Sequence, residues 1–416
     1  MSPTSRPAES RFRWTICALL FLATVIAYVD RGVLAYLEKT LEGIIGWDRE
    51  QYSYMTAAFQ AAYAIGMVCA GWLTDRLGTR RGFALAITLW SVAAMGPAAA
   101  YSVFTFGVAM FVLGLGEAAN FPACIKTVAE WFPKKERALA TGIFNSGAAI
   151  GAITVPVVVP FLAGALGWRG AFVATGALGF IWLAAWLKLY GKPESHVWVS
   201  KAELAHIQSD PPEKLESVPW IRIIRLPETW AFAIGKFLTD PVWWFYIFWI
   251  PRYLQGTFHL TLGTSSAPVV AIYVISCLGS VGGGWLSSIM LKRGKSLNVS
   301  RKTAMLICAL SVAPVALVPT ATNMWVVVAL VGWATAAHQG WSANLFTLVS
   351  DMFPKAAVGS VVGFGGMVGS AGGVLLQLLA GRLSYVVLYA IAGTAYVTAL
   401  LIVQILTPKL APVQVD

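Results

Sequence analysis

The chain has 416 residues, of which 58% are hydrophobic and only 12% carry a charge. This balance excludes an ordinary soluble globular protein and predicts an all-α membrane protein with many spans. The net charge of +11 is also typical of nucleic-acid binding, but Lys and Arg flanking membrane helices on the cytoplasmic side explain it without that partner.

Apolar stretches of about 20 residues, the length that crosses a bilayer, recur along the whole chain. Of the 30 Lys and Arg, 22 flank these stretches on one side of the membrane, five flank them on the other side, and three lie inside them. This asymmetry predicts that the richer side, with both termini, is cytoplasmic. The twelve predicted spans lie near residues 14–37, 51–74, 82–102, 104–130, 138–163, 170–190, 228–255, 265–291, 303–320, 323–352, 356–381 and 384–407.

A long polar segment, residues 191–227, contains five prolines and charges of both signs. We expect it to be a cytoplasmic linker between an N-terminal six-helix bundle, residues 1–190, and a C-terminal one, residues 228–416. Its sequence SKAEL is typical of the start of a short surface helix. The sequence EWFPKKERALATG at 130–142 returns as DMFPKAAVGSVVG at 351–363, which indicates two repeated halves with a substrate site between them.

Ionisable residues inside three spans are the first candidates for function, because a charge in the bilayer is costly. Asp30 and Arg31 lie in the first span, and Glu117 lies in the fourth. We expect Glu117 to carry a proton, Asp30 to be a second protonation site, and Arg31 to bind a carboxylate. An interfacial pair that reaches the periplasmic surface is the alternative for Asp30 and Arg31. Lys126 ranks below Arg31 as an anchor, since snorkelling explains it.

The seventh span carries Lys236 and Asp240 at positions i and i+4, where they can pair on one helical face. Aromatic side chains follow them, and these can stack on a sugar ring or simply pack between helices. The aromatic residues are Trp243, Trp244, Tyr246 and Trp249, of which Trp244 is the site candidate.

Polar residues also interrupt the fifth and tenth spans, where they are candidates for binding sugar hydroxyls. His338 is as compatible with a hydrogen bond between helices as with a ligand contact. Small residues around Asn145 predict close packing of the fifth helix against a neighbour. The hydroxyl-binding candidates are Asn145, Gln339, Ser342 and Asn344.

The sequence GWLTDRLGTRR at 71–81 combines glycine, an acid, a basic residue, glycine and paired arginines after the second span. It resembles the signature of the major facilitator superfamily, in type and in place. The resemblance implies the twelve-helix fold of that family and a cytoplasmic gate braced by the acid. The signature residues are Gly71, Asp75, Arg76, Gly78, Arg80 and Arg81.

Tyr28, Asp30, Arg31 and Tyr63, together with GLGEAANFPA at 114–123, resemble the anion:cation symporter branch of this superfamily. The resemblance implies that Arg31 grips the substrate carboxylate, and that Asp30 and Glu117 couple uptake to proton entry. The stretches KFLTDPVWWFYIFWIPRYL at 236–254 and HQGWSANLFTLVSDMFP at 338–354 are similar to the hexuronate transporter subgroup.

One position departs from the pattern of that branch. Its members usually carry an arginine seven residues before the Glu of the fourth helix, and this chain has Met110 there. In the family that arginine interacts with the Glu, so Met110 predicts weakened coupling between protons and substrate. An absent positive charge also favours the neutral form of Glu117.

Together, the residues and the resemblance predict a proton-coupled symporter that imports hexuronates, glucuronate or galacturonate, across the inner membrane of a bacterium. Another organic anion, an aldonate such as galactonate or a dicarboxylate, is the alternative substrate. The sequence shows neither a nucleophile–base pair nor a metal cluster, so we expect no enzyme, no cofactor besides protons, and no metal. The expected partners are a small sugar acid and the lipid bilayer, and the expected state is a monomer.

Overall fold

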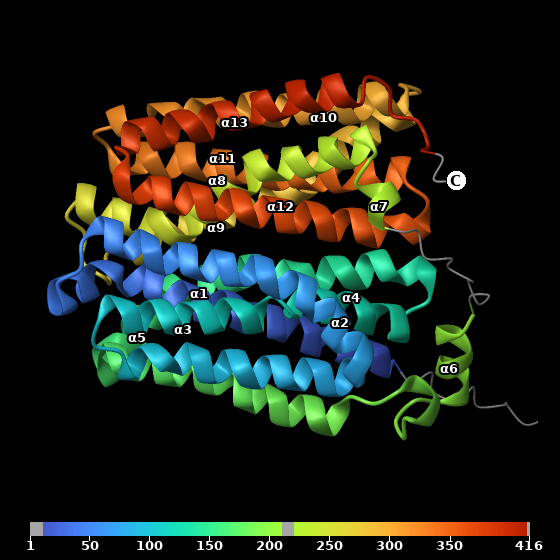
Figure 1. Ribbon diagram of the computed structural model, residues 1–416, viewed down its shortest axis with the longest axis horizontal. Coiled ribbons are helices and arrows are strands. Elements are labelled where there is room, and N and C mark those ends of the chain that lie inside the picture. The colour runs from blue at the N-terminus through green and yellow to red at the C-terminus, as the bar shows by residue number, and fades with distance from the viewer. Residues whose placement is uncertain (1–10, 210–219, 414–416) are drawn as a thin grey trace, which may run out of the picture.

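The computed structural model describes residues 11–209 and 220–413, apart from a few side chains within helices. Long helices run roughly parallel to one another, with α1 to α5 on one side and α8 to α13 on the other (Figure 1). The first set comprises α1 (Phe12–Ile45), α2 (Arg49–Met95), η1 (Gly96–Ala99), α3 (Val103–Glu117), α4 (Asn120–Trp131) and α5 (Lys134–Leu189).

Three short helices lie between the two sets: η2 (Pro193–Ser195), α6 (Lys201–Ile207) and α7 (Trp220–Ile223). The second set comprises α8 (Pro227–Thr257), α9 (Ser266–Lys292), α10 (Leu297–Val312), η3 (Ala313–Thr320), α11 (Met324–Met352), α12 (Lys355–Arg382) and α13 (Tyr385–Leu406). The division of the chain into halves at residues 190 and 228 remains a prediction.

Two of the long helices are sharply broken at a glycine. Gly78 in α2 has φ 75° and ψ 157°, and Gly167 in α5 has φ 71° and ψ 170°. Only glycine adopts such angles at low cost, so each helix reverses there and counts as two passes. With one pass each from α1, α3–α4, α8, α9, α10–η3, α11, α12 and α13, the described chain makes the twelve predicted passes. Residues 71–81, which carry the predicted signature after the second span, are therefore helical on both sides of Gly78.

Seven stretches of the described chain are long and apolar enough to cross a membrane by length and composition alone. The helices α8 and α11 are not among them. They hold three candidate residues, of which Lys236 and His338 are buried and Asp240 is half-buried. The polar character that lowers the hydropathy of α8 and α11 therefore coincides with the candidate site.

The repeated sequence occupies the same structural place in both sets of helices. Phe132 is the C-cap of α4, and Pro133 is the N-cap of α5 with φ −64° and ψ 153°. Phe353 is the C-cap of α11, and Pro354 is the N-cap of α12 with φ −61° and ψ 148°. Proline suits a helix start because its missing N–H is not needed there. The predicted repeat is confirmed at this junction.

Small residues of α5 pack against α1, as the sequence predicts. A Cβ on Gly147 would lie 2.6 Å from the carbonyl oxygen of Phe21, and one on Gly151 would lie 2.5 Å from Cβ of Tyr28. No larger residue fits at either position without a shift of the backbone. This close approach fixes the depth at which Tyr28 and its neighbours lie against α5.

The predicted short helix of the linker is also confirmed, as α6. The Ser200 side chain accepts a hydrogen bond from the Glu203 N–H and caps the helix. Glu203 accepts from the backbone N–H of Phe12 and Arg13 at 3.1 Å, and Arg13 also pairs with Glu136 at 2.9 Å. These contacts tie α6 to the starts of α1 and α5.

Candidate substrate and proton site

A buried ion pair between Arg31 of α1 and Glu117 of α3 forms the centre of the site. Glu117 Oε2 lies 2.5 Å from Arg31 Nη2 and 2.8 Å from Nε, and the two residues are 0% and 2% exposed. Glu117 Oε1 has no hydrogen-bond partner among the described residues. A buried pair of this kind is sensitive to the loss of either charge, since the other is then left uncompensated.

The helix is interrupted next to Glu117, and Pro122 explains the interruption. Glu117 ends α3 and Asn120 begins α4. Pro122 has no N–H to donate to the carbonyl of Ala118, so a continuous helix would lose a bond there. The Ala119 N–H bonds to the Gly116 carbonyl at 3.3 Å and tightens the turn. The proton-carrying candidate therefore lies at an irregular point of the backbone.

Aromatic rings surround the Arg31 guanidinium from both sets of helices. Its central carbon lies 4.2 Å from the ring centre of Tyr28, 5.1 Å from Trp244 and 5.6 Å from both Phe59 and Tyr63. Cation–π attraction of this kind is worth about 0.5–2 kcal/mol per ring. The rings therefore hold the guanidinium between α1 and α8 and present it to the interface of the two sets.

Asp30 lies beside this pair, with its side chain fully enclosed. It is 3% exposed, and neither carboxylate oxygen has a hydrogen-bond partner among the described residues. An ionised carboxylate without a partner is expensive to bury. This environment suits a group that takes up and releases a proton, and Asp30 does not reach the surface as the interfacial alternative requires.

Met110 is buried in α3 and is 1% exposed. The positively charged partner of Glu117 in this structure is Arg31, which lies on a different helix. Met110 supplies no charge, as the sequence predicts, and the weakened coupling inferred from it stays a prediction. Glu117 has a guanidinium partner although residue 110 does not supply it.

On the side of the second set, Lys236 and Asp240 form the predicted i, i+4 pair, with Nζ 2.7 Å from Oδ2. The Lys236 ammonium also lies 4.5 Å from the ring centre of Phe346. A Cβ on Gly369 of α12 would be 2.8 Å from Asp240 Oδ2, so α12 closes over this pair. Lys236 is 6% exposed, which makes it a second buried cation of the interior.

Two candidates of α11 turn out to serve helix packing. His338 Nδ1 lies 2.6 Å from the Tyr396 hydroxyl, and its ring stacks on Trp243 at 5.2 Å. Asn344 is 1% exposed and donates to the carbonyls of Gly283 and Gly340 at 3.0 and 2.9 Å. Both side chains are thus engaged between helices, but Asn344 Oδ1 has no hydrogen-bond partner among the described residues, so its contact with a sugar hydroxyl stays a prediction.

The remaining predicted binding residues are either half-buried or distant from the Arg31–Glu117 pair. Gln339, Ser342 and Lys126 are half-buried, and Asn145 is exposed. Because Gly151 lies level with Tyr28, the rise of a helix puts Asn145 about 9 Å along α5 from that level. The structure therefore does not bring Asn145 to Arg31.

The signature residues lie around Gly78, where the first pass of α2 ends, away from the α1–α2 turn. Arg76, Arg80 and Arg81 are exposed, and an Arg80 Nη2 donates to the Leu187 carbonyl. Gly71 and Asp75 lie outside the residues whose side chains are described.

Sequence reasoning missed Gln60 of α2. It is 0% exposed, and neither its amide oxygen nor its nitrogen has a partner among the described residues. A Cβ on Gly373 of α12 would lie 2.7 Å from Gln60 Nε2, so the amide lies between the two sets of helices. A polar residue inside an apolar span is the signal that could have found it.

Sequence reasoning also missed a set of contacts that bridge the two sets near the α1–α2 turn. Arg252 of α8 pairs with Glu38 and, at 3.1 Å, with Glu42 of α1. The Tyr52 hydroxyl donates to the Phe248 carbonyl at 2.8 Å. These residues lie at the ends of the predicted spans, where charges are expected for orientation alone.

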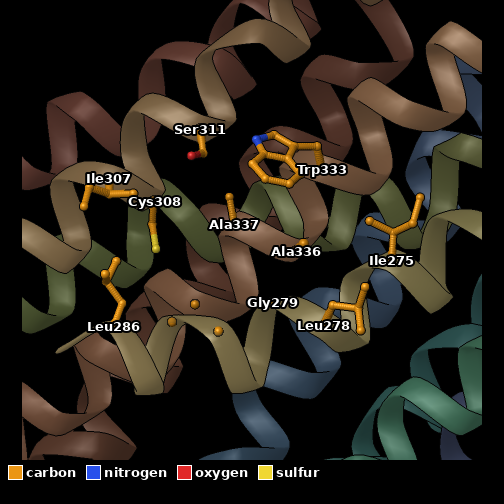
Figure 2. A pocket seen from close by; sticks show the side chains of 13 residues that line it. Ile275, Leu278, Gly279, Leu286, Ile307, Cys308, Ser311, Trp333, Ala336 and Ala337 are labelled. Carbon is orange, nitrogen blue, oxygen red and sulfur yellow. The ribbon is translucent and has the colours of Figure 1, made fainter. Parts of the chain in front are cut away.

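An apolar cavity, shown in Figure 2, offers no charged group to a substrate among its described lining residues. It measures about 250 Å³ and lies among α9, α10 and α11, with Leu286, Ile307 and Ala337 in its wall. Leu278 and Trp333 in its wall are 71% and 59% exposed, so it opens on the outer flank. Among its described lining residues there is no charged side chain, unlike the interior around Arg31.

Comparisons with known proteins agree with the geometry of helices and buried charges. The Major Facilitator Superfamily matches residues 20–377. The hexuronate transporter of Escherichia coli is 33% identical over 381 residues, which cover 89% of this chain and 88% of that protein. The galacturonate transporter of Dickeya chrysanthemi is 33% identical over 305 residues, 72% of this chain and 88% of that one.

Two further comparisons extend the similarity. The probable galactarate/D-glucarate transporter of Bacillus subtilis is 30% identical over 403 residues, 91% of this chain and 87% of that protein. In fold, the xylose transporter of Escherichia coli in an inward-open conformation superposes with a TM-score of 0.72 at 15% identity, covering 95% of this chain and 96% of that chain.

An all-helical membrane protein with buried charges between two sets of helices defines a multi-pass transporter rather than an enzyme. The chain belongs to the Major Facilitator Superfamily.

Proposed function

We propose that this protein is a proton-coupled symporter of a sugar acid, with hexuronates as the preferred substrates. The observation that carries the proposal is the Arg31–Glu117 ion pair, because it occupies the guanidinium that a substrate carboxylate would bind. The relatives named for hexuronate, galacturonate and galactarate/glucarate transport support a sugar acid as the substrate class.

The coupling follows from competition between two carboxylates for one guanidinium. A proton on Glu117 Oε1, the oxygen without a partner, removes the negative charge and leaves Arg31 as an uncompensated buried cation. The substrate carboxylate restores the balance when it takes the place of Glu117 on Arg31. Proton and substrate therefore bind together more favourably than either binds alone.

The rings around Arg31 complete the binding site. Tyr28, Tyr63 and Trp244 lie within 5.7 Å of the guanidinium or of one another and offer faces and hydroxyls to a sugar ring. Gln60 offers an amide with both hydrogen-bonding functions free among the described residues. Asp30 is the second proton site. Bacterial relatives and the Lys and Arg distribution support the inner membrane, with cytoplasmic termini.

Uptake of radiolabelled glucuronate into proteoliposomes, with and without an inward proton gradient, tests this function. We expect accumulation only with the gradient, and loss of glucuronate binding in Arg31→Gln. The matched control is Arg169→Gln, which removes a charge at the start of the last pass of α5 and should leave binding intact. A wild-type protein that neither binds nor accumulates any sugar acid would overturn the proposal.

A dicarboxylate such as glucarate is the second candidate substrate, and Lys236 favours it. This second buried cation is paired only within α8, to Asp240, among the contacts observed there. Two carboxylates could then occupy Arg31 and Lys236. Lys236→Gln should weaken glucarate binding at least tenfold and glucuronate binding little if the natural substrate carries two carboxylates. Equal effects on the two ligands would count against this candidate.

A further inference from the structure

A small basic cavity lies between the two sets of helices at the α1–α2 end, away from the Arg31 site. It measures about 140 Å³ and is formed by α1, α2, α8 and the start of α13. Lys39, Arg49 and Arg252 contribute three basic side chains to its wall, and Tyr385 contributes an aromatic ring. Nothing in the transport mechanism above uses this cavity.

Arg49 is the unexplained residue of this cavity. Its Nε and Nη2 atoms are buried, and neither has a hydrogen-bond partner among the described residues. Its guanidinium carbon lies 4.2 Å from the ring centre of Tyr385 and 5.4 Å from that of Trp249, so two rings hold it in place. Donors of a charged group left without a partner are costly, which indicates that they serve a ligand.

The acids on either side of Arg49 in the chain are engaged elsewhere. Asp48 accepts from the Gln51 N–H at 2.7 Å and caps α2. Glu50 accepts from Arg382 at 2.8 Å. Neither side chain is therefore committed to the Arg49 guanidinium.

The acids of α1 are engaged as well, with the other two cations of the cavity. Glu42 pairs with Lys39 at 2.5 Å and with Arg252, and Glu38 also pairs with Arg252. Among the described residues, Arg49 is thus the cation of this wall that the neighbouring acids leave unpaired.

The size and place of the cavity fit the charged end of a substrate on its way to Arg31. Its volume exceeds that of several water molecules at ~30 Å³ each, but is below the ~300 Å³ of a site that encloses a whole ligand. Lys39 follows Arg31 by eight residues on α1, and Arg252 follows Trp244 by eight on α8. Each interval is about 12 Å of helix rise. The same two helices therefore carry both sites.

We propose that this cavity is a recruitment site for the carboxylate of an incoming sugar acid, and that Arg49 is the main residue that binds it. A carboxylate bound there also competes with Glu38 and Glu42 for Arg252, and so weakens the α1–α8 ion pairs that bridge this end. The choice of a sugar acid as the ligand rests on the proposed function, whereas the binding of a carboxylate in this cavity does not. One experiment therefore tests carboxylate binding, and a second tests the role of the cavity in uptake.

The first experiment measures binding of acetate, the carboxylate alone, to the purified full-length protein by saturation-transfer NMR. The Arg31→Gln background removes the central anchor and isolates the cavity. We expect an acetate signal in that background, no signal from neutral acetamide, and loss of the acetate signal when Arg49→Gln is added. Adding Arg169→Gln instead, which removes one positive charge near the same end, should keep the signal. An acetate signal that survives Arg49→Gln would overturn the site, whatever the transported substrate is.

The second experiment measures initial uptake rates in proteoliposomes for Arg49→Gln and Arg169→Gln. Loss of one charge-assisted contact in the recruitment step should raise KM about three- to tenfold and leave kcat nearly unchanged. The dependence of KM on ionic strength should weaken as well. An unchanged KM, with acetate binding confirmed, would show that the cavity binds carboxylates without serving uptake and would overturn the recruitment role. A thermal-unfolding scan of each variant establishes that it is folded.

Discussion

At the scale of single residues, Arg31 decides how the site works, because its guanidinium has two competing uses. It holds Glu117 in this structure, and in the proposed cycle it holds the substrate carboxylate. In that proposed cycle, the charge of Glu117 controls whether Arg31 is available. Substitutions at Glu117 and near it give the most direct tests of this competition.

Glu117→Gln imitates the protonated side chain and leaves Arg31 permanently available. We expect the variant to retain counterflow exchange of a sugar acid but to lose accumulation driven by a proton gradient, by at least tenfold. Paired counterflow and gradient-driven uptake assays on the same proteoliposomes distinguish the two activities. Glu194→Gln, which changes an exposed carboxylate of the linker, is the matched control. Accumulation at the wild-type level by Glu117→Gln would show that the proton is carried elsewhere.

Met110→Arg introduces the charge that the family resemblance leads us to expect at this position. Because Met110 is 1% exposed, the new guanidinium must find a buried partner, and Glu117 lies two turns away on α3. We expect it to draw Glu117 from Arg31 and change the proton dependence of uptake. Uptake measured from pH 5 to 8 tests this, with Met110→Gln as the control for size and polarity. A pH profile identical to that of wild type would show that residue 110 does not act on Glu117.

At the scale of elements, α6 is the part of the linker that the structure attaches to the transmembrane helices. Glu136 of α5 lies 2.9 Å from Arg13 Nε of α1 and 3.0 Å from His206 Nε2 of α6. Partial burial raises the pKa of Glu136, but the contacts with Arg13 and His206 outweigh burial and lower the pKa below its usual 4.5. The charged carboxylate is thus favoured where α6 is docked.

The lowered pKa of Glu136 sets the pH range in which α6 stays docked. A lowered pKa contributes stability that is fully present above the ordinary pKa of about 4.5 and is lost as the pH falls through the lower, folded-state value. We expect a spin label at the exposed Lys201 to stay immobile from pH 7 to about 5 and to become mobile in more acidic buffer. Arg13→Gln should make the label mobile already at pH 7. An immobile label in that variant would mean that other contacts dock α6.

At the scale of the whole molecule, the contacts near the α1–α2 turn hold the two sets of helices together at one end. Glu38 is 0% exposed and pairs with Arg252, which is 7% exposed. Removing one partner of a buried pair costs about 3–5 kcal/mol, because the other charge is left uncompensated. This cost destabilises the conformation that is closed at this end. Removing the ion pair therefore favours the conformation that is open there.

Glu38→Gln should therefore shift the protein toward opening at the α1–α2 end. We expect a longer distance between spin labels at Gly43 and Thr261, two exposed positions at this end on opposite sides of the interface, in double electron–electron resonance. Glu228→Gln, at the start of α8 and far from the α1–α2 turn, is the control. An unchanged distance distribution in Glu38→Gln would remove this ion pair from the account of gating.

The membrane class, the twelve passes, the repeat at Pro133 and Pro354, and the buried charges at Arg31 and Glu117 are readable from the chain itself. Each depends on a local signal: hydropathy over about 20 residues, a repeated sequence, or a charge where apolar residues are required. The i, i+4 pair of Lys236 and Asp240 is local for the same reason, because both residues lie on one face of one helix.

The partners of these residues were decided only by tertiary structure. Three contacts depend on how the helices rotate and cross: Glu117 meets Arg31 from 86 residues away, Asn344 donates one hydrogen bond to Gly283 of α9, and Arg252 pairs with Glu38. Helical periodicity identifies the face on which a side chain lies, but not which distant helix packs against that face. The chain alone therefore determined which residues carry charge into the membrane, and the packing of the helices determined which charge each of them meets.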